Sequence, residues 1–299
     1  MSKINLEIGV LNIAMHNHDK GALSYKNLFY FLHNEKIDIK IDDTHRVYIG
    51  ELNTEKEYGN RPYFIGMLYK YAKIDPEKEC LNTETNEEAT SKEKEALKTP
   101  DNLRPHIMKI PFIFIPNGHR FYIRIKHKKD SFGITKAKRF LEKLFQHEKV
   151  IDQFGDVEVT IEPDSLEIER LLNRKDISKL TLDIVRPNPD DFKIAEKNLF
   201  DKMEKRKLRK QRIEYSSIRN ENLHLDSELQ DEIRIASCNG KVVAEGIDSS
   251  DTKWKTSTEE INLIVKTDYI SERNEENKGK DFAEEKLIEI AFDTHNKIV

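Results

Sequence analysis

The stretch that decides the fold of this chain is KIPFIFIPNGHRFYIRIKHK, residues 109–128. Large apolar residues recur at every second position on either side of the pair Asn117-Gly118, and after the pair basic residues or a tyrosine stand between them. An Asn-Gly pair between two alternating runs is the strongest short-range signal for a β-hairpin. A two-residue loop at this pair places Phe114 opposite Phe121, and the pairing continues outward from there. The segment is therefore predicted to be a hairpin within a sheet.

The two faces of this hairpin carry opposite chemistry. One face collects only large apolar side chains: Ile110, Phe112, Phe114, Phe121, Ile123 and Ile125. The other face carries the candidate nucleic-acid-binding residues Arg120, Tyr122, Arg124 and Lys126. An aromatic ring between two arginines is an arrangement with which sheets stack a base and hold the flanking phosphates. The apolar face is predicted to be core, and the basic face is either a nucleic-acid surface or a solvated strand face.

The bulk composition limits the class of protein. A chain of 299 residues can bury a sizeable core and form two domains, or one large and one small. Charged residues make up 35% of it, but the net charge is −4, so any site for a polyanion has to be a local patch. The two cysteines lack metal-type spacing, and no signal peptide or membrane span is apparent. We expect a cytoplasmic protein with reduced thiols and no membrane contact.

The periodicity of the apolar residues predicts an α+β fold with mainly antiparallel sheets, helices packed on one face and a ferredoxin-like middle region. Residues 82–100 contain no aromatic or β-branched aliphatic residue, so burial cannot offset the entropy of ordering them. Five regions are predicted: an N-terminal β-α-β-β-β region (1–81), a mobile polar loop (82–104), a middle β-β-α-β-α-β region that shares the core (105–187), a basic helix (188–220), and a small C-terminal region of helix and hairpin (221–299).

The basic helix is the second candidate for binding nucleic acid. Asn188 and Pro189 are a strong N-cap and first-turn pair, and the helix is predicted to continue past Arg212. Residues 197–212 hold eight basic side chains and two acids, and the apolar stripe stops after Met203. The candidate contacts are Lys205, Arg206, Arg209 and Lys210. Phosphates would relieve the repulsion among these cations. A solvated helix, or one docked on an acidic protein surface, is the other interpretation.

Carboxylates supply the alternative hypothesis of catalysis. Glu158 and Glu162 lie on one face of a predicted strand, and Asp183 lies on a strand that could be adjacent. Such a cluster can hold Mg²⁺ for phosphodiester cleavage, although the acid-x-Lys pairing typical of nucleases is missing after Glu158. No cofactor is expected unless this nuclease alternative holds. The chain has no dinucleotide, P-loop, hydrolase-elbow or zincin motif.

Several phrases resemble one known family. They are Leu11-Asn12-Ile13 near a histidine, residues 112–122, the phrase LTLDIVRPNPDD at residues 180–191, and the glycine-containing run at residues 239–246. Together they resemble bacterial proteins of the domain of unknown function 4747, and the strand followed by RPNPDD is the most specific piece. The resemblance implies a bacterial cytoplasmic setting and an association with mobile elements and phage defence. It supplies no catalytic residues.

The leading hypothesis is a phage-defence-type protein that binds DNA or RNA through the hairpin face and the basic helix. The first alternative is a metal-dependent nuclease or ribonuclease toxin. The second is a regulator without catalysis, whose basic helix docks on a protein partner from the same defence locus.

Overall fold

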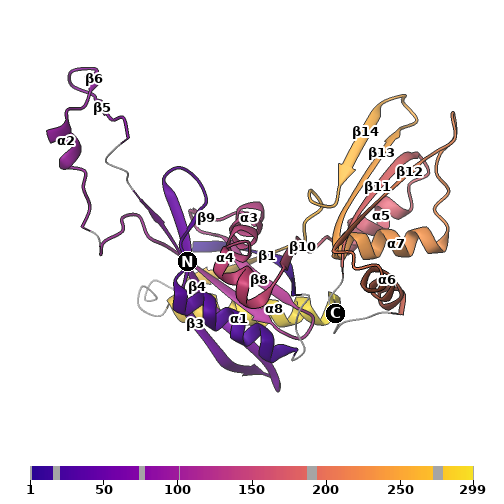
Figure 1. Ribbon diagram of the computed structural model, residues 1–299, viewed down its shortest axis with the longest axis horizontal. Helices are drawn as coiled ribbons and strands as arrows, with labels where there is room; N and C mark the ends of the chain where they lie inside the picture. Colours follow the sequence, from indigo (N-terminus) through magenta and orange to yellow (C-terminus); the bar gives the residue numbers. More distant parts are fainter. Residues whose placement is uncertain are drawn as a thin grey trace.

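The computed structural model of the chain describes residues 2–15, 21–73, 78–100, 102–186, 194–271 and 279–298. Its larger sheet has the strand order β10-β1-β8-β7-β4-β3-β2, with β15 beside β1 and β9 beside β8 (Figure 1). The strands are β1 (Ser2–Met15), β2 (Ile39–Lys40), β3 (His45–Tyr58), β4 (Arg61–Ala72), β7 (Met108–Ile115), β8 (Arg120–His127), β9 (Asp130–Ser131), β10 (Val157–Ile161) and β15 (Ile264–Ser271). Their pairings are antiparallel, which confirms the predicted α+β class with mainly antiparallel sheets.

The β7–β8 hairpin has the predicted register. Phe114 lies opposite Phe121, and Phe112 lies opposite Ile123. The turn differs from the predicted one, because positive φ angles occur at Gly118 and His119 rather than at Asn117. His119 is drawn inward: its carbonyl accepts a hydrogen bond of 3.0 Å from the backbone of β1, and its side chain is buried. Tertiary contacts therefore set the turn, while the alternation of side chains sets the register.

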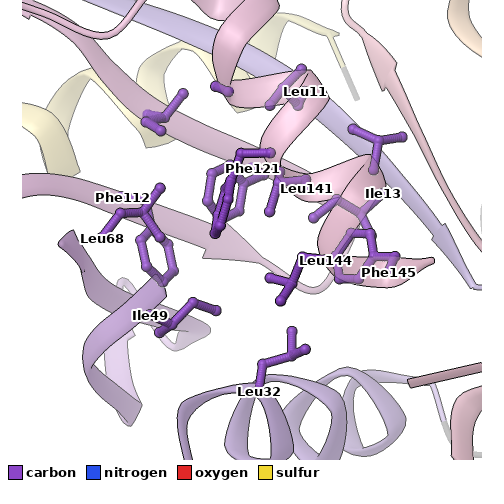
Figure 2. Packing of buried hydrophobic residues seen from close by; sticks show 14 of the residues in the cluster. Leu11, Ile13, Leu32, Ile49, Leu68, Phe112, Phe121, Leu141, Leu144 and Phe145 are labelled. Carbon is purple, nitrogen blue, oxygen red and sulfur yellow. The ribbon is translucent and has the colours of Figure 1, made fainter. Parts of the chain in front are cut away.

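Helices cover both faces of the larger sheet. On one face α1 (Ala22–Glu35), α3 (Ile134–Phe145) and α4 (Glu148–Phe154) close the main core, in which Leu32 and Leu144 pack towards Phe121 (Figure 2). On the other face α8 (Gly279–Ile298) packs Leu287 and Phe292 on the sheet. The second helix layer goes beyond the prediction of helices on one face only.

The smaller sheet has the order β12-β11-β13-β14 and stands beside the larger one (Figure 1). Its strands are β11 (Ile177–Val185), β12 (Lys210–Ser216), β13 (Gly240–Ile247) and β14 (Lys253–Ser257). The helices α5 (Ser165–Leu172), α6 (Ile194–Lys205) and α7 (Ser227–Cys238) pack on one face of it. Asp164 and Asp226 cap α5 and α7 by accepting backbone hydrogen bonds of 2.9 Å.

The chain passes between the sheets in a way that the predicted regions do not reproduce. In the middle region β7, β8 and β10 belong to the larger sheet and β11 to the smaller one, so these strands do not form one ferredoxin-like layer. In the C-terminal region β13 and β14 form the predicted hairpin, but β15 returns to pair with β1. Pairing between distant segments decides both outcomes.

The basic helix is shorter than predicted. α6 ends at Lys205 in a Schellman motif: the amide of Leu208 donates to the carbonyl of Met203 (2.8 Å), and that of Lys207 donates to Glu204 (2.9 Å). Lys207 takes the left-handed conformation usually left to glycine, with φ 55°. Leu208 packs in the same core as Met203, and β12 follows. The predicted cap at residues 188–189 lies outside the described residues.

The segment predicted as a mobile polar loop has local structure. β5 (Leu81–Asn82), β6 (Glu87–Glu88) and α2 (Ser91–Glu95) form an arm that projects from the larger sheet (Figure 1). Thr90 and Glu93 make a capping box at the start of α2, and Asn82 donates to Glu93 at 2.7 Å. Polar side chains therefore supply the order that the missing apolar residues cannot.

Candidate nucleic-acid interface

A groove with a volume of about 550 Å³ lies where the two sheets meet. The larger sheet contributes α3 and β10 to its walls, and the smaller sheet contributes β11, β12 and β13. Glu158, Asp183 and Lys210 all line it, so the fold brings together candidates from the predicted carboxylate cluster and the predicted basic helix. Its charged lining is balanced, with the cations Lys138, Lys210, Arg212 and Lys241 and the acids Glu142, Glu158, Asp183 and Glu259.

Hydrogen bonds between the larger sheet and α7, which packs on the smaller sheet, fix the position of the groove walls. The carbonyl of Cys238, at the end of α7, accepts a hydrogen bond of 3.0 Å from the hydroxyl of Thr160 on β10. The side-chain amide of Asn12 on β1 donates to the same carbonyl at 3.4 Å. These contacts join the smaller sheet to the edge of the larger one.

Acids of β10 and the loop before it hold the cations that follow α6. Arg209 donates from Nε to Glu158 at 2.8 Å and from its terminal nitrogen to Asp156 at 3.1 Å. Lys210 lies 3.3 Å from the other oxygen of Glu158. The side chain of Glu158 is 15% exposed, whereas those of Arg209 and Lys210 are about half exposed. Two of the predicted nucleic-acid contacts are thus paired with one of the predicted catalytic acids.

The other groove carboxylates are also paired with cations. Arg212 forms a two-pronged ion pair with Asp183, and this hydrogen bonding holds the pKa of Asp183 below its usual range. Burial alone would raise the pKa of Glu259, but hydrogen bonds from Lys138 (2.7 Å) and Lys241 (2.6 Å) keep it below its usual range. Within the described residues, no group of three or more His, Cys, Asp or Glu side chains could hold a metal ion. The predicted acids Glu158 and Asp183 are arranged as partners of basic side chains.

The face of the smaller sheet opposite its helices is rich in cations. Leu180, Leu182 and Ile184 point into the core, so their neighbours along β11 point to the other face. Pairing carries this alternation across the sheet. The open face holds the cations Lys179, Lys210, Arg212, Lys241, Lys253 and Lys255 and the acids Asp183, Glu214 and Glu245.

Just before β12, whose Lys210 and Arg212 belong to this open face, lies what we call the basic corner: Lys202, Lys205, Arg206 and Lys207 at the end of α6. All four side chains are exposed, and in the described part of the chain none of them forms an ion pair. The Schellman motif creates this cluster, because it turns the chain sharply while Met203 and Leu208 point inward. Lys205 and Arg206, predicted as contacts on a long helix, therefore sit at a turn.

The predicted hairpin face requires a correction. Tyr122 is fully buried under α8, with its hydroxyl 3.1 Å from Nδ1 of His295, and burial raises its pKa. Its ring therefore cannot stack a base in this structure. Arg120 lies 2.8 Å from the buried carboxylate of Glu162, the third predicted catalytic acid.

The outer two residues of that face are engaged as well. The Arg124 guanidinium donates to the carbonyl of Lys109, and Lys126 lies 3.3 Å from Glu7 on β1. The alternation correctly separated the two faces of the hairpin, but the second face is buried at Tyr122 and its cations are engaged within the protein.

The burial of His295 predicts an acid-labile contact. Burial, together with the charges of Arg120 and Arg61, lowers the pKa of His295 to about 4, so the folded protein binds this proton more weakly than the unfolded chain does. The stabilisation of the folded protein by neutral His295 is complete above about pH 6.5. It is lost as the pH falls towards 4, and the loss is at most about 3 kcal/mol. We expect His295→Gln to lose less unfolding free energy between pH 7.5 and 5 than the unaltered protein. An equal loss would contradict this, since His127, whose pKa is also lowered to about 4, titrates in both proteins.

Three groove residues escaped the reasoning from sequence. Lys138, Lys241 and Glu259 come from α3, β13 and the loop after β14, and none of them was a candidate site residue, although Lys241 lies in the run at residues 239–246. Their ion pairs form only after the two sheets meet, so no local pattern could have marked them.

The fold and the interface define a class: an antiparallel α+β protein of two joined sheets, with a basic corner at the end of α6 and a cation-rich face on the smaller sheet. Residues 4–289 match the family described as a domain of unknown function (DUF4747), so the chain belongs to that family. No curated protein matches the chain. None of the described helices is both long and apolar enough to span a membrane.

Proposed function

We propose that this protein binds nucleic acid through its phosphate backbone, at the basic corner and the adjoining open face of the smaller sheet. The observation that carries the proposal is the set of four exposed cations at Lys202, Lys205, Arg206 and Lys207, which have no acidic partner in the described part of the chain. Neutralising phosphates releases counterions from a polyanion, and this drives binding without regard to base sequence. The net charge of −4 confines such binding to this patch.

The family resemblance supplies the biological setting of the proposal. Proteins that restrict phage act on, or near, invading nucleic acid, so a backbone-binding surface suits a phage-defence role. We propose that role here, with plaque formation in cells expressing the protein as its measure. The basic corner should be needed for any protection that the protein confers.

Neutralising the corner tests the proposed binding. The change Lys205→Ala with Arg206→Ala is expected to weaken binding of both duplex and single strands by about tenfold or more, and to reduce the slope of log affinity against log salt by about two. Fluorescence anisotropy with a labelled oligonucleotide measures both. The matched control is Lys92→Ala with Lys129→Ala, which removes two exposed lysines elsewhere and should change affinity little.

The other outcomes decide against the proposal. Equal losses of affinity in the two double variants would show that binding depends on the net charge of the protein and not on the basic corner. Divalent-metal-dependent cleavage that is lost in Glu158→Gln would favour the nuclease alternative. A stoichiometric protein complex that resists nuclease treatment and depends on Lys205 and Arg206 would favour the regulator alternative.

A further inference from the structure

Three tyrosines lie together on the larger sheet, far in strand order from the groove. Tyr48 on β3 pairs with Tyr69 on β4, and Tyr69 pairs in turn with Lys109 on β7. Tyr71 lies two residues further along β4, on the same face. The core-facing neighbours Val47, Ile49 and Leu68 belong to the opposite face, so these rings share the face on which α8 packs.

The rings form a compact cluster edged by cations. The centroid of Tyr48 lies 5.6 Å from that of Tyr69 and 6.1 Å from that of Tyr71, with both pairs near perpendicular. Nζ of Lys109 lies 5.0 Å from the centroid of Tyr69, and the Arg104 guanidinium lies 5.9 Å from that of Tyr71. We call these five residues the tyrosine platform.

A glycine in the backbone of β3 makes room for one ring of the platform. A Cβ at Gly50 would lie 2.5 Å from the ring of Tyr69, so this ring rests directly on the strand. Tyr48 and Tyr69 remain half-buried, and the side chain of Lys109 is 42% exposed. By contrast, Tyr58 and Tyr63 at the other end of the hairpin contact Phe292 of α8. α8 thus makes its aromatic contacts at the far end of these strands.

A pocket of about 280 Å³ adjoins the platform, and Lys109 and Glu51 line it. Apolar side chains of Met67, Met108 and Pro111 contribute to it, together with Arg124, His127 and the acids Asp130 and Glu284. The hydroxyl of Tyr69 donates a hydrogen bond to Glu51, and this contact connects the tyrosine platform to the pocket. Half-buried aromatic rings with cations and acceptors at their edge suit a planar heteroaromatic group that carries phosphate.

We propose that the tyrosine platform binds unpaired bases of single-stranded nucleic acid, a step that rests on the proposed backbone binding and gives it a strand preference. A base can stack on the half-buried ring of Tyr69, which Lys109 now edges, and the Lys109 ammonium can then hold a neighbouring phosphate in place of Glu51, which lies 3.6 Å away. Sheets that bind single strands combine aromatic side chains with cations in this way, and stacking tolerates any base sequence. Duplex DNA hides its base faces, so it gains nothing from the platform.

The experiment compares single and double strands of the same sequence, about 12 nucleotides long. Tyr69→Leu in the full-length protein is expected to weaken single-strand binding about tenfold and to leave duplex binding unchanged, because each stacked base contributes about 1 to 3 kcal/mol. Tyr69→Phe keeps the ring and should stay within about twofold of the unaltered protein. The matched control is Tyr30→Leu, since Tyr30 is an exposed tyrosine on α1 that also carries a lysine, Lys26, 5.8 Å from its ring.

Photo-crosslinking separates the platform from the basic corner. A single strand carrying 4-thiouridine should form adducts at the platform tyrosines, in the Lys205→Ala, Arg206→Ala variant as well. If the single strand binds without forming these adducts, the platform proposal fails and the proposal for the basic corner stands. If adducts form and the affinity is unchanged in the Lys205→Ala, Arg206→Ala variant, only the proposal for the basic corner fails. Equal effects of Tyr69→Leu and Tyr30→Leu, or altered self-association in place of altered strand binding, would also overturn the platform.

Discussion

Replacing Arg120 with methionine is expected to lower the free energy of unfolding by about 3 to 5 kcal/mol, because the change leaves a buried carboxylate without its cation. The side chains of Arg120 and Glu162 are only 12% and 5% exposed, and their charged atoms lie 2.8 Å apart. Arg120 also donates to the side-chain oxygen of Asn12 at 3.0 Å. Urea denaturation followed by circular dichroism measures the loss.

Two further variants isolate the cost of the buried charge. Replacing both Arg120 and Glu162 with methionine should recover most of the loss, since an apolar pair of similar volume needs no partner. The same methionine change at Arg212, whose side chain is 71% exposed, should cost at most about 1 kcal/mol although it breaks an ion pair with Asp183. Equal losses at Arg120 and Arg212 would show that the Arg120–Glu162 pair is hydrated in solution.

Local signals in the sequence predicted the parts of the fold that local physics determines. The register of the β7–β8 hairpin follows from the alternation along β8 and the position of the turn, because a shift of one residue would move Phe112 and Phe114 out of the main core to the opposite face of the sheet. The caps Asp164 and Asp226 bond to amides two and three residues later, so their partners lie in the same short segment. Neither feature depends on the rest of the chain.

The errors arose where distant segments meet. Alternation placed Tyr122 opposite the core, but only the return of α8, more than 150 residues later, shows that this second face is also buried. The end of α6 was hidden because a lysine, Lys207, occupies the position where a glycine would mark the stop. The groove acids looked catalytic in isolation and became ion-pair partners once β11 and β12 lay next to β10.

Replacing Asp156 with asparagine and Glu158 with glutamine is expected to raise affinity for nucleic acid between ten- and a hundredfold at low salt. These acids hold Arg209 and Lys210, so they occupy the positions that phosphates would take beside the basic corner. Their neutralisation frees two cations and eliminates two negative charges that would repel phosphate. The slope of log affinity against log salt should therefore steepen by about two. Fluorescence anisotropy over a series of salt concentrations measures both quantities.

The control separates local pairing from net charge. Glu57→Gln with Glu84→Gln also removes two negative charges, from exposed acids on β3 and in the projecting arm that form no ion pair in the described part of the chain. Because exposed charges farther apart than about 10 Å are screened at moderate salt, this variant should gain little affinity. A similar gain in both variants would mean that net charge alone limits binding. A gain confined to Asp156 and Glu158 would mean that the protein's own carboxylates compete with phosphate for Arg209 and Lys210.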